Sequence, residues 1–124
     1  MSAHLSARQE RGEAICRSLP ASPGIYIIWF DGLSRAYIGQ SSNIAHRVRT
    51  HLYEMETFKG HKMRGDLDTM GWGRLNATAL ETAQTCEALH LAETRWMNKY
   101  RNSGWSLYNH DATGKVHRDR ARAR

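Results

Sequence analysis

Two short apolar runs within residues 24–39 are joined by Asp31-Gly32. Apolar and β-branched runs on either side of Asp-Gly are the strongest short-range signal for a β-hairpin. A two-residue turn would place Tyr26 opposite Tyr37. A turn longer by two residues would shift the pairing but not the face, because strand side chains alternate with a period of two. The pattern therefore predicts two phenols side by side on one face of a hairpin.

The rest of the chain alternates between helical and strand-like patterns. The first strand is apolar at nearly every position, which predicts a central strand that helices cover on both faces. A third strand is expected over residues 74–80, where polar and apolar positions alternate. Helices are expected near the N-terminus with Ser6 and Gln9 as a capping box, over residues 43–55, weakly within 61–70, and from Thr82 or Thr85 to about Asn102.

The helix expected over residues 43–55 carries charged side chains beside its apolar stripe. Arg47 and His51 are four residues apart, so they share one stripe at the edge of the core. His46 and Arg49 should point to solvent. The apolar positions that define the buried face are Ile44, Val48, Leu52 and Met55.

Glu93 falls in phase with the apolar stripe of the last helix. A carboxylate on the buried side of a helix needs a cation, hydrogen-bond donors or a metal ion. Taken alone, an ion pair with Arg47 or Arg95 is the commoner arrangement, and metal ligation is the rarer one. The stripe itself consists of Cys86, Leu89, Trp96, Met97 and Tyr100.

Composition narrows the class of protein. A chain of 124 residues fits one small domain, and its net charge of +6 favours a polyanionic partner such as nucleic acid. The two cysteines form neither a zinc motif nor a disulfide framework, and no apolar run is long enough for a membrane span. A cytoplasmic, DNA-associated protein is expected. We divide it into an N-terminal helix and linker (1–21), a central domain (22–111) and a basic, disordered tail (112–124).

Several of these residues follow one another in an order that resembles the GIY-YIG nuclease family. That family has a Gly-x-Tyr strand, a Tyr-Ile-Gly strand, a helix with an arginine and often a histidine, a later helix with a glutamate, and then an asparagine. The matching residues here are Gly24-Ile25-Tyr26, Tyr37-Ile38-Gly39, Arg47, His51, Glu93 and Asn109. The resemblance covers residues 22–111. It implies an α+β fold with a small three-stranded antiparallel sheet flanked by helices.

The resemblance also implies metal-dependent hydrolysis of phosphodiester bonds in DNA. Glu93 would hold one Mg²⁺ or Mn²⁺ ion, with water completing the coordination shell. Arg47 would bind the non-bridging phosphate oxygens, which suit its planar guanidinium. Each residue type taken alone fits a structural role better, and it is their joint order that favours the nuclease.

A phenol would then help to activate the attacking water. Tyr26 is our choice for the general base, and Tyr37 would orient water or phosphate, although the sequence leaves the assignment of the two open. Because a free phenol has a pKa of about 10, a base role requires nearby cations. His51 would orient Tyr26 or protonate the leaving group, and Asn109 would position the other groups by hydrogen bonding.

Binding of DNA is expected to draw on basic side chains in the domain and the tail. The alternative function is a catalytically silent nucleic-acid-binding module of the same fold. With so little surface beyond the site, strong sequence specificity would require a homodimer or a protein partner. The side chains expected to contact nucleic acid are Arg47, Arg49, His61, Lys62, Lys115, Arg118 and Arg120.

Overall fold

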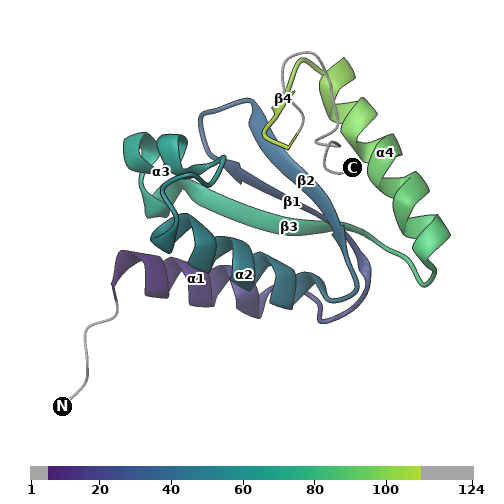
Figure 1. Cartoon of the computed structure of the whole chain (residues 1–124), viewed down its shortest axis with the longest axis horizontal. Helices are drawn as coiled ribbons and strands as arrows, with labels where there is room; N and C mark the ends of the chain where they lie inside the picture. The colour runs from purple at the N-terminus through teal and green to yellow at the C-terminus, as the bar shows by residue number, and fades with distance from the viewer. Residues whose placement is uncertain (1–5, 110–124) are drawn as a thin grey trace.

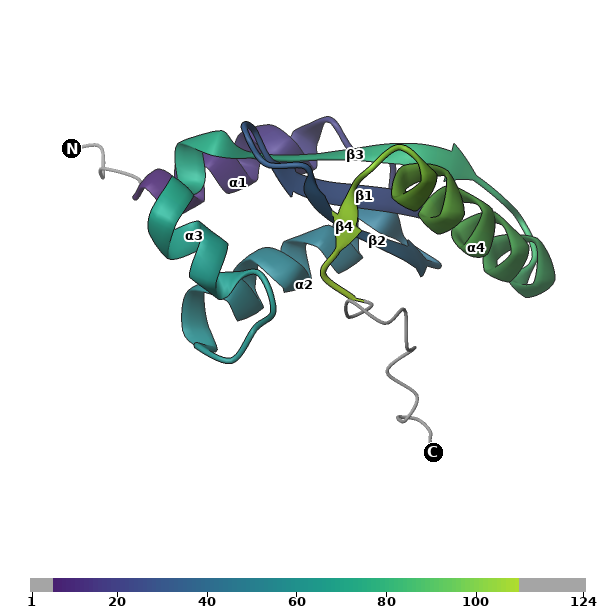
Figure 2. The ribbon, with the colours of Figure 1, turned by 90° about the horizontal axis from the view of Figure 1, so that it is seen from above.

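A computed structural model describes residues 6–109 of the chain. A four-stranded sheet lies between α4 on one face and α1, α2 and α3 on the other (Figures 1 and 2). The helices are α1 (Ala7–Arg17), α2 (Ile44–Thr57), α3 (Arg64–Met70), the 3₁₀ helix η1 (Trp72–Arg74) and α4 (Cys86–Asn102), and the strands are β1 (Gly24–Phe30), β2 (Arg35–Ser41), β3 (Leu75–Thr82) and β4 (Ser106–Leu107).

The sheet has the strand order β3-β1-β2-β4. β1 is central and antiparallel to both β2 and β3, as its apolar composition predicts. The prediction of three strands is wrong, because β4 adds a fourth strand that runs parallel to β2 at Arg35 and Ala36. A two-residue strand has no periodicity that a sequence could reveal. It forms because the chain turns at Gly104, whose φ is 94°, and returns along β2.

The first hairpin has a longer turn than Asp31-Gly32 alone. Tyr26 lies opposite Gly39, and Ile28 lies opposite Tyr37, so residues 31–34 form the connection. The two-residue turn is therefore wrong, and the alternative with two additional residues holds. Both phenols remain on one face, because the shift is an even number of residues.

The N-terminal ends of α1 and α4 carry predicted caps, and Asn43, the first residue of the helix expected over 43–55, caps α2. Ser6 and Gln9 form a reciprocal capping box at the start of α1. The side chain of Asn43 accepts a hydrogen bond at the start of α2, and that of Thr85 does so at the start of α4. These caps fix where α2 and α4 begin, and so fix which of their residues face the sheet.

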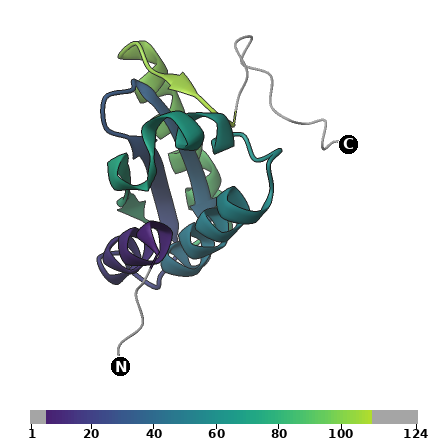
Figure 3. The same ribbon diagram turned by 90° about the vertical axis from the view of Figure 1, so that its left-hand side faces the viewer.

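Two apolar clusters hold the sheet between its helices. On one face α1 and α2 pack side by side (Figure 3), and their buried residues meet alternate residues of β1. On the other face α4 covers Ile25, Ile27, Ala36 and Ile38.

The prediction that Cys86 belongs to the buried face of α4 is wrong, since Cys86 is exposed in the first turn. Within residues 6–109, no helix is long and apolar enough to cross a membrane.

Candidate active site

Tyr26 of β1 and Tyr37 of β2 lie side by side, as the hairpin pattern predicts. Their ring centroids are 6.3 Å apart, and the ring planes differ by 6°. Gly39 makes room for this pair, because a Cβ on Gly39 would lie 2.5 Å from the Tyr26 hydroxyl oxygen. Tyr26 is 2% exposed, whereas Tyr37 is partly exposed. Tyr26 is therefore nearly enclosed, whereas part of Tyr37 reaches the surface.

His51 of α2 contacts both phenols. It is 2% exposed, its Nε2 atom lies 2.9 Å from the Tyr26 hydroxyl oxygen, and its ring meets the Tyr37 ring edge-on at 4.5 Å. Arg47, one turn earlier on α2, is partly buried and lies close enough to the two phenols for its charge to lower their pKa. The structure thus brings together Tyr26, Tyr37, Arg47 and His51.

Burial and charge set the protonation of this cluster. Burial raises the pKa of both phenols above 10, Arg47 acts in the opposite direction, and the negative charge of Glu93 raises the pKa further. Burial, Arg47 and His61 together lower the pKa of His51 to about 3. His51 is therefore a neutral imidazole at pH 7, while both phenols are protonated in the absence of further positive charge.

A pocket of about 280 Å³ opens beside the cluster. Its wall combines three of the four clustered residues with Glu54 of α2 and with residues of the loop that follows α2. His61 lies in this wall, and burial lowers its pKa. The pocket is a concave, basic site wide enough for a phosphate group, and its lining residues are Tyr37, Arg47, His51, Glu54, Phe58, Gly60, His61 and Lys62.

Glu93 lies on the opposite side of β2, on α4. Its carboxylate accepts a hydrogen bond from Gln40 Nε2 at 3.2 Å, and burial raises its pKa. The ion pair with Arg95 is wrong, because Arg95 instead binds Glu81 at 2.6 Å. Among residues 6–109, Glu93 forms no ion pair with Arg47 either. His90 is the basic side chain that acts on Glu93, by lowering its pKa. A half-buried carboxylate that no Arg or Lys pairs with among residues 6–109 is a good ligand for a cation.

Asn109 reaches the same stretch of β2. Its Nδ2 atom donates a hydrogen bond to the backbone carbonyl of Ile38, two residues before Gln40. Its Oδ1 atom is buried and has no partner among the described residues. Glu93 and Asn109 thus each form a hydrogen bond with β2, and the Asn109 Oδ1 atom has no hydrogen-bond partner among the described residues. Carboxylate and amide oxygens are hard ligands, which Mg²⁺ and Mn²⁺ prefer.

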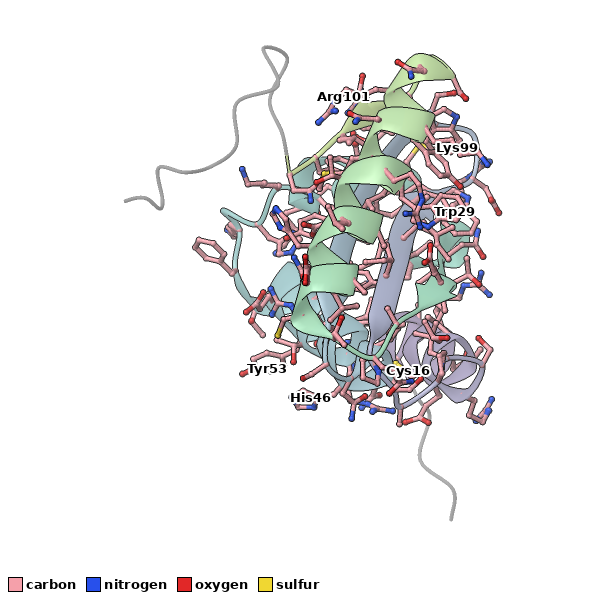
Figure 4. All side chains as sticks on the ribbon, turned by 90° about the vertical axis from the view of Figure 1, so that its right-hand side faces the viewer. Cys16, Trp29, His46, Tyr53, Lys99 and Arg101 are labelled. Carbon is pink, nitrogen blue, oxygen red and sulfur yellow. The ribbon has the colours of Figure 1, made fainter. Side chains whose placement is uncertain are left out.

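Of the remaining basic residues, His61 and Lys62 adjoin the cluster, whereas Arg49 and His46 do not. Arg49 is exposed on α2 as predicted, and His46 projects outward from the same helix (Figure 4). His61 and Lys62 line the pocket. The other three predicted contacts, Lys115, Arg118 and Arg120, lie outside the described residues.

Two residues of the site do not stand out in the sequence. Gln40 directly follows Tyr37-Ile38-Gly39, and strand alternation turns its side chain toward α4 and Glu93. Glu54 lies three residues after His51 and lines the same pocket. The period of two in the strand could have indicated Gln40, and the helical spacing from His51 could have indicated Glu54. Neither spacing identifies a site residue until the packing of α2 and α4 on the sheet is known.

Comparison with known proteins agrees with this geometry. The model of the GIY-YIG catalytic domain matches residues 22–109. No curated protein matches the chain. Solved structures of the GIY-YIG N-terminal endonuclease domain of UvrC from Thermotoga maritima are similar in fold.

Two tyrosine point mutants of that domain, each bound to its catalytic divalent cation, align with a TM-score of 0.50 at 18% and 19% identity. Both alignments cover 83% of this chain and 98% of the other. The magnesium-bound form of that domain aligns with a TM-score of 0.47 at 19% identity, covering 74% of this chain and 92% of the other. Since the family model spans most of the described residues and carries the paired tyrosines, the chain belongs to the GIY-YIG family of nuclease domains.

Proposed function

We propose that the protein is a divalent-metal-dependent endonuclease that hydrolyses DNA phosphodiester bonds. The observation that carries this proposal is the convergence of Tyr26, Tyr37, Arg47 and His51 beside one basic pocket. Membership of the GIY-YIG family supports it. The net charge of +6 also favours a polyanionic substrate.

Glu93 is proposed to hold the metal ion, and Asn109 to position groups next to it. Among residues 6–109, the half-buried Glu93 carboxylate has no ion pair with Arg or Lys, and the Asn109 Oδ1 atom has no hydrogen-bond partner. The UvrC domains of similar fold bind a catalytic divalent cation, which supports the same class of cofactor. When bound, Mg²⁺ or Mn²⁺ supplies a Lewis acid that polarises phosphate and screens its negative charge.

Arg47 is proposed to bind the non-bridging oxygens of the phosphate. Arg47 lies at the pocket wall, and both phenols act electrostatically on its guanidinium, so a cation stands at the pocket before substrate binds. A preorganised cation of this kind stabilises the charge that develops on phosphate in the transition state. Removal of such a group costs on the order of 10²–10³ in rate.

Tyr26 is proposed as the general base and Tyr37 as the group that orients water or phosphate. Tyr26 contacts two groups, Arg47 and His51, that can stabilise its oxygen. Burial works against ionisation of this phenol, so a base role requires the positive charge of Arg47 and a bound cation. The accessible Tyr37 at the pocket wall fits an orienting role.

The second candidate function is a DNA-binding module that does not cut. The basic pocket alone would serve such a module equally well. Glu93 favours the nuclease, because a half-buried carboxylate repels phosphate and is useful to a DNA-binding site only with a cation. A protein that acts on DNA is proposed to be intracellular, and a requirement for a second copy or a partner stays a prediction.

Cleavage of supercoiled plasmid and of labelled single-stranded DNA tests the proposal. Each substrate is incubated with Mg²⁺, with Mn²⁺ or with chelator. Cutting is expected only with metal, and Glu93→Gln and Arg47→Ala should each lower the rate by about 10²–10³. Glu87→Gln is the matched control, because Glu87 is exposed in the first turn of the same helix.

Two results would contradict the proposal. Metal-independent cutting that survives Glu93→Gln would remove the assigned role of Glu93. Intact DNA binding without cutting of either substrate would favour the non-cutting module. The two substrates, run in parallel, also report which form of DNA is preferred.

A further inference from the structure

A chain of three hydrogen bonds runs from the loop after α2 to Tyr26. The backbone N–H of Met63 donates to His61 Nδ1 at 3.0 Å. His61 Nε2 lies 3.3 Å from His51 Nδ1. His51 Nε2 lies 2.9 Å from the Tyr26 hydroxyl oxygen. The two imidazoles meet edge-on, with ring centroids 5.5 Å apart. The motif that identifies the family contains Tyr26 and His51, and it contains neither Met63 nor His61.

The direction of this chain follows from its first member. A backbone N–H can only donate, so His61 Nδ1 carries no proton. Neutral His61 then carries its proton on Nε2, which faces His51 Nδ1. His51 Nδ1 must accept, so the proton of His51 lies on Nε2, which faces Tyr26. Every donor in the chain thereby faces an acceptor.

The opposite direction leaves two donors facing each other. If His51 accepted the Tyr26 proton at Nε2, its own proton would lie on Nδ1 and point at His61 Nε2. His61 would then need its proton on Nδ1, where the Met63 N–H already points at 3.0 Å. Positive charge on either ring creates a similar conflict. Burial and Arg47 lower the pKa of both histidines, so neutral rings are favoured.

We propose that His61 is a positioning residue, which fixes His51 in the tautomer that donates a hydrogen bond to the Tyr26 oxygen. His51 is then not the acceptor of the Tyr26 proton. The hydroxyl proton of Tyr26 is free to point away from His51, and an ionised Tyr26 would receive hydrogen bonds from both His51 and Arg47. The consequence for catalysis rests on the proposed nuclease function, whereas the tautomer itself does not.

The same side chains invite a different interpretation, which is a second metal centre. His51, Glu54 and His61 offer ligand atoms that all lie within 4.8 Å of one another. Two histidines and a carboxylate suit zinc. However, a metal ion on His61 Nε2 would move the ring proton to Nδ1, against the Met63 N–H. The hydrogen bond from Met63 therefore favours the proton chain over the metal centre.

Ring-nitrogen NMR of the ¹⁵N-labelled full chain tests the tautomer directly, at pH 7 and with chelator present. Long-range correlations should show His51 and His61 each protonated at Nε2. His61→Phe keeps an aromatic ring but removes the donor, so His51 should become a mixture of tautomers. His61→Gln, whose amide can donate, should restore part of the Nε2–H population. His46→Gln is the control, because His46 is exposed on the same helix.

Cleavage rates measured on the same samples give a second readout. Loss of one hydrogen bond of about 1 kcal/mol predicts a roughly fivefold lower rate for His61→Phe, with part of the loss recovered in His61→Gln. Thermal unfolding shows whether each variant is folded. Because the tautomer is read without any substrate, a protein that does not cut DNA would refute the nuclease but not the tautomer.

Three results would overturn the proposal. The first is a wild-type His51 protonated at Nδ1. The second is a folded His61→Phe variant in which neither the tautomer of His51 nor the cleavage rate changes. The third is stoichiometric binding of added zinc that shifts both His51 Nδ1 and His61 Nε2, which would establish the metal centre instead.

Discussion

The two sides of β2 differ in how completely their polar groups are paired. On the α2 side, Tyr26, His51 and His61 form a continuous hydrogen-bonded series that ends on a backbone N–H. On the α4 side, Glu93 accepts a hydrogen bond from the Gln40 side chain. Asn109, which donates to the backbone carbonyl of Ile38 in β2, has a buried oxygen without a partner among residues 6–109. The first side is assembled by the protein itself, and the second has oxygen atoms available for a ligand.

The two sides of β2 should therefore respond differently to substitutions. A self-paired network is coupled to folding, so substitutions there should alter stability and its pH dependence. Oxygen atoms held by few contacts contribute little to folding, so substitutions there should alter ligand binding while leaving the fold intact. Four predictions follow this division, from the largest expected effect to the smallest.

The largest effect concerns acid stability on the α2 side. Folding lowers the pKa of His51 from 6.5 to about 3, so below pH 6.5 the unfolded chain binds a proton that the folded protein does not. The free energy of unfolding should therefore fall with decreasing pH, by up to about 5 kcal/mol between pH 6.5 and 3. Denaturant unfolding at a series of pH values measures this slope.

His51→Gln should flatten that slope, whatever its stability at pH 7. His46→Gln should retain it, because His46 is exposed on the outer side of α2. An identical slope in His51→Gln and the wild type would show that burial of this imidazole is not the cause.

The second effect concerns metal on the α4 side. Binding of Mg²⁺ or Mn²⁺ to the folded protein at about 100 times its Kd should stabilise the wild type by about 2.7 kcal/mol, and Glu93→Gln should abolish that gain. Without metal the two proteins should unfold similarly. Thermal unfolding with and without metal measures both. Equal stabilisation of the wild type and Glu93→Gln would place the ion elsewhere.

The third effect tests the close approach of Gly39 to Tyr26. A Cβ on residue 39 would lie 2.5 Å from the phenol oxygen, so Gly39→Ala must displace the ring. A loss of about 1–3 kcal/mol in stability is expected, with a lower cleavage rate. Gly65→Ala is the control, since a Cβ there meets no atom within 4 Å in α3. Unchanged stability in Gly39→Ala would mean that the Tyr26 ring can move freely.

The smallest effect lies where β4 joins the sheet. The Tyr108 hydroxyl donates to Asp66, which also binds Arg35 at 2.6 Å. Tyr108→Phe should cost about 1 kcal/mol, the usual net value of one such hydrogen bond. Urea unfolding of the two proteins provides the measurement. A much larger loss would mean that this contact, rather than the backbone pairing of β4, holds the fourth strand.

Local patterns in the sequence predicted the hairpin, the central position of β1, the caps of α1 and α4, and the shared stripe of Arg47 and His51. These features depend on local periodicity and on side chains that bond to nearby backbone, so a few consecutive residues encode them. The resemblance to the GIY-YIG family likewise rests on short, ordered motifs, and the family model confirms it.

The remaining features depend on how distant parts of the chain pack together. The fourth strand exists because residues 106–107 meet β2, and two residues carry no pattern of their own. Glu93 meets Gln40 rather than an arginine, and His61 meets His51, because α4 and the loop after α2 pack against the sheet at particular positions. Contacts between residues far apart in the chain depend on how whole elements pack, and no local spacing specifies that.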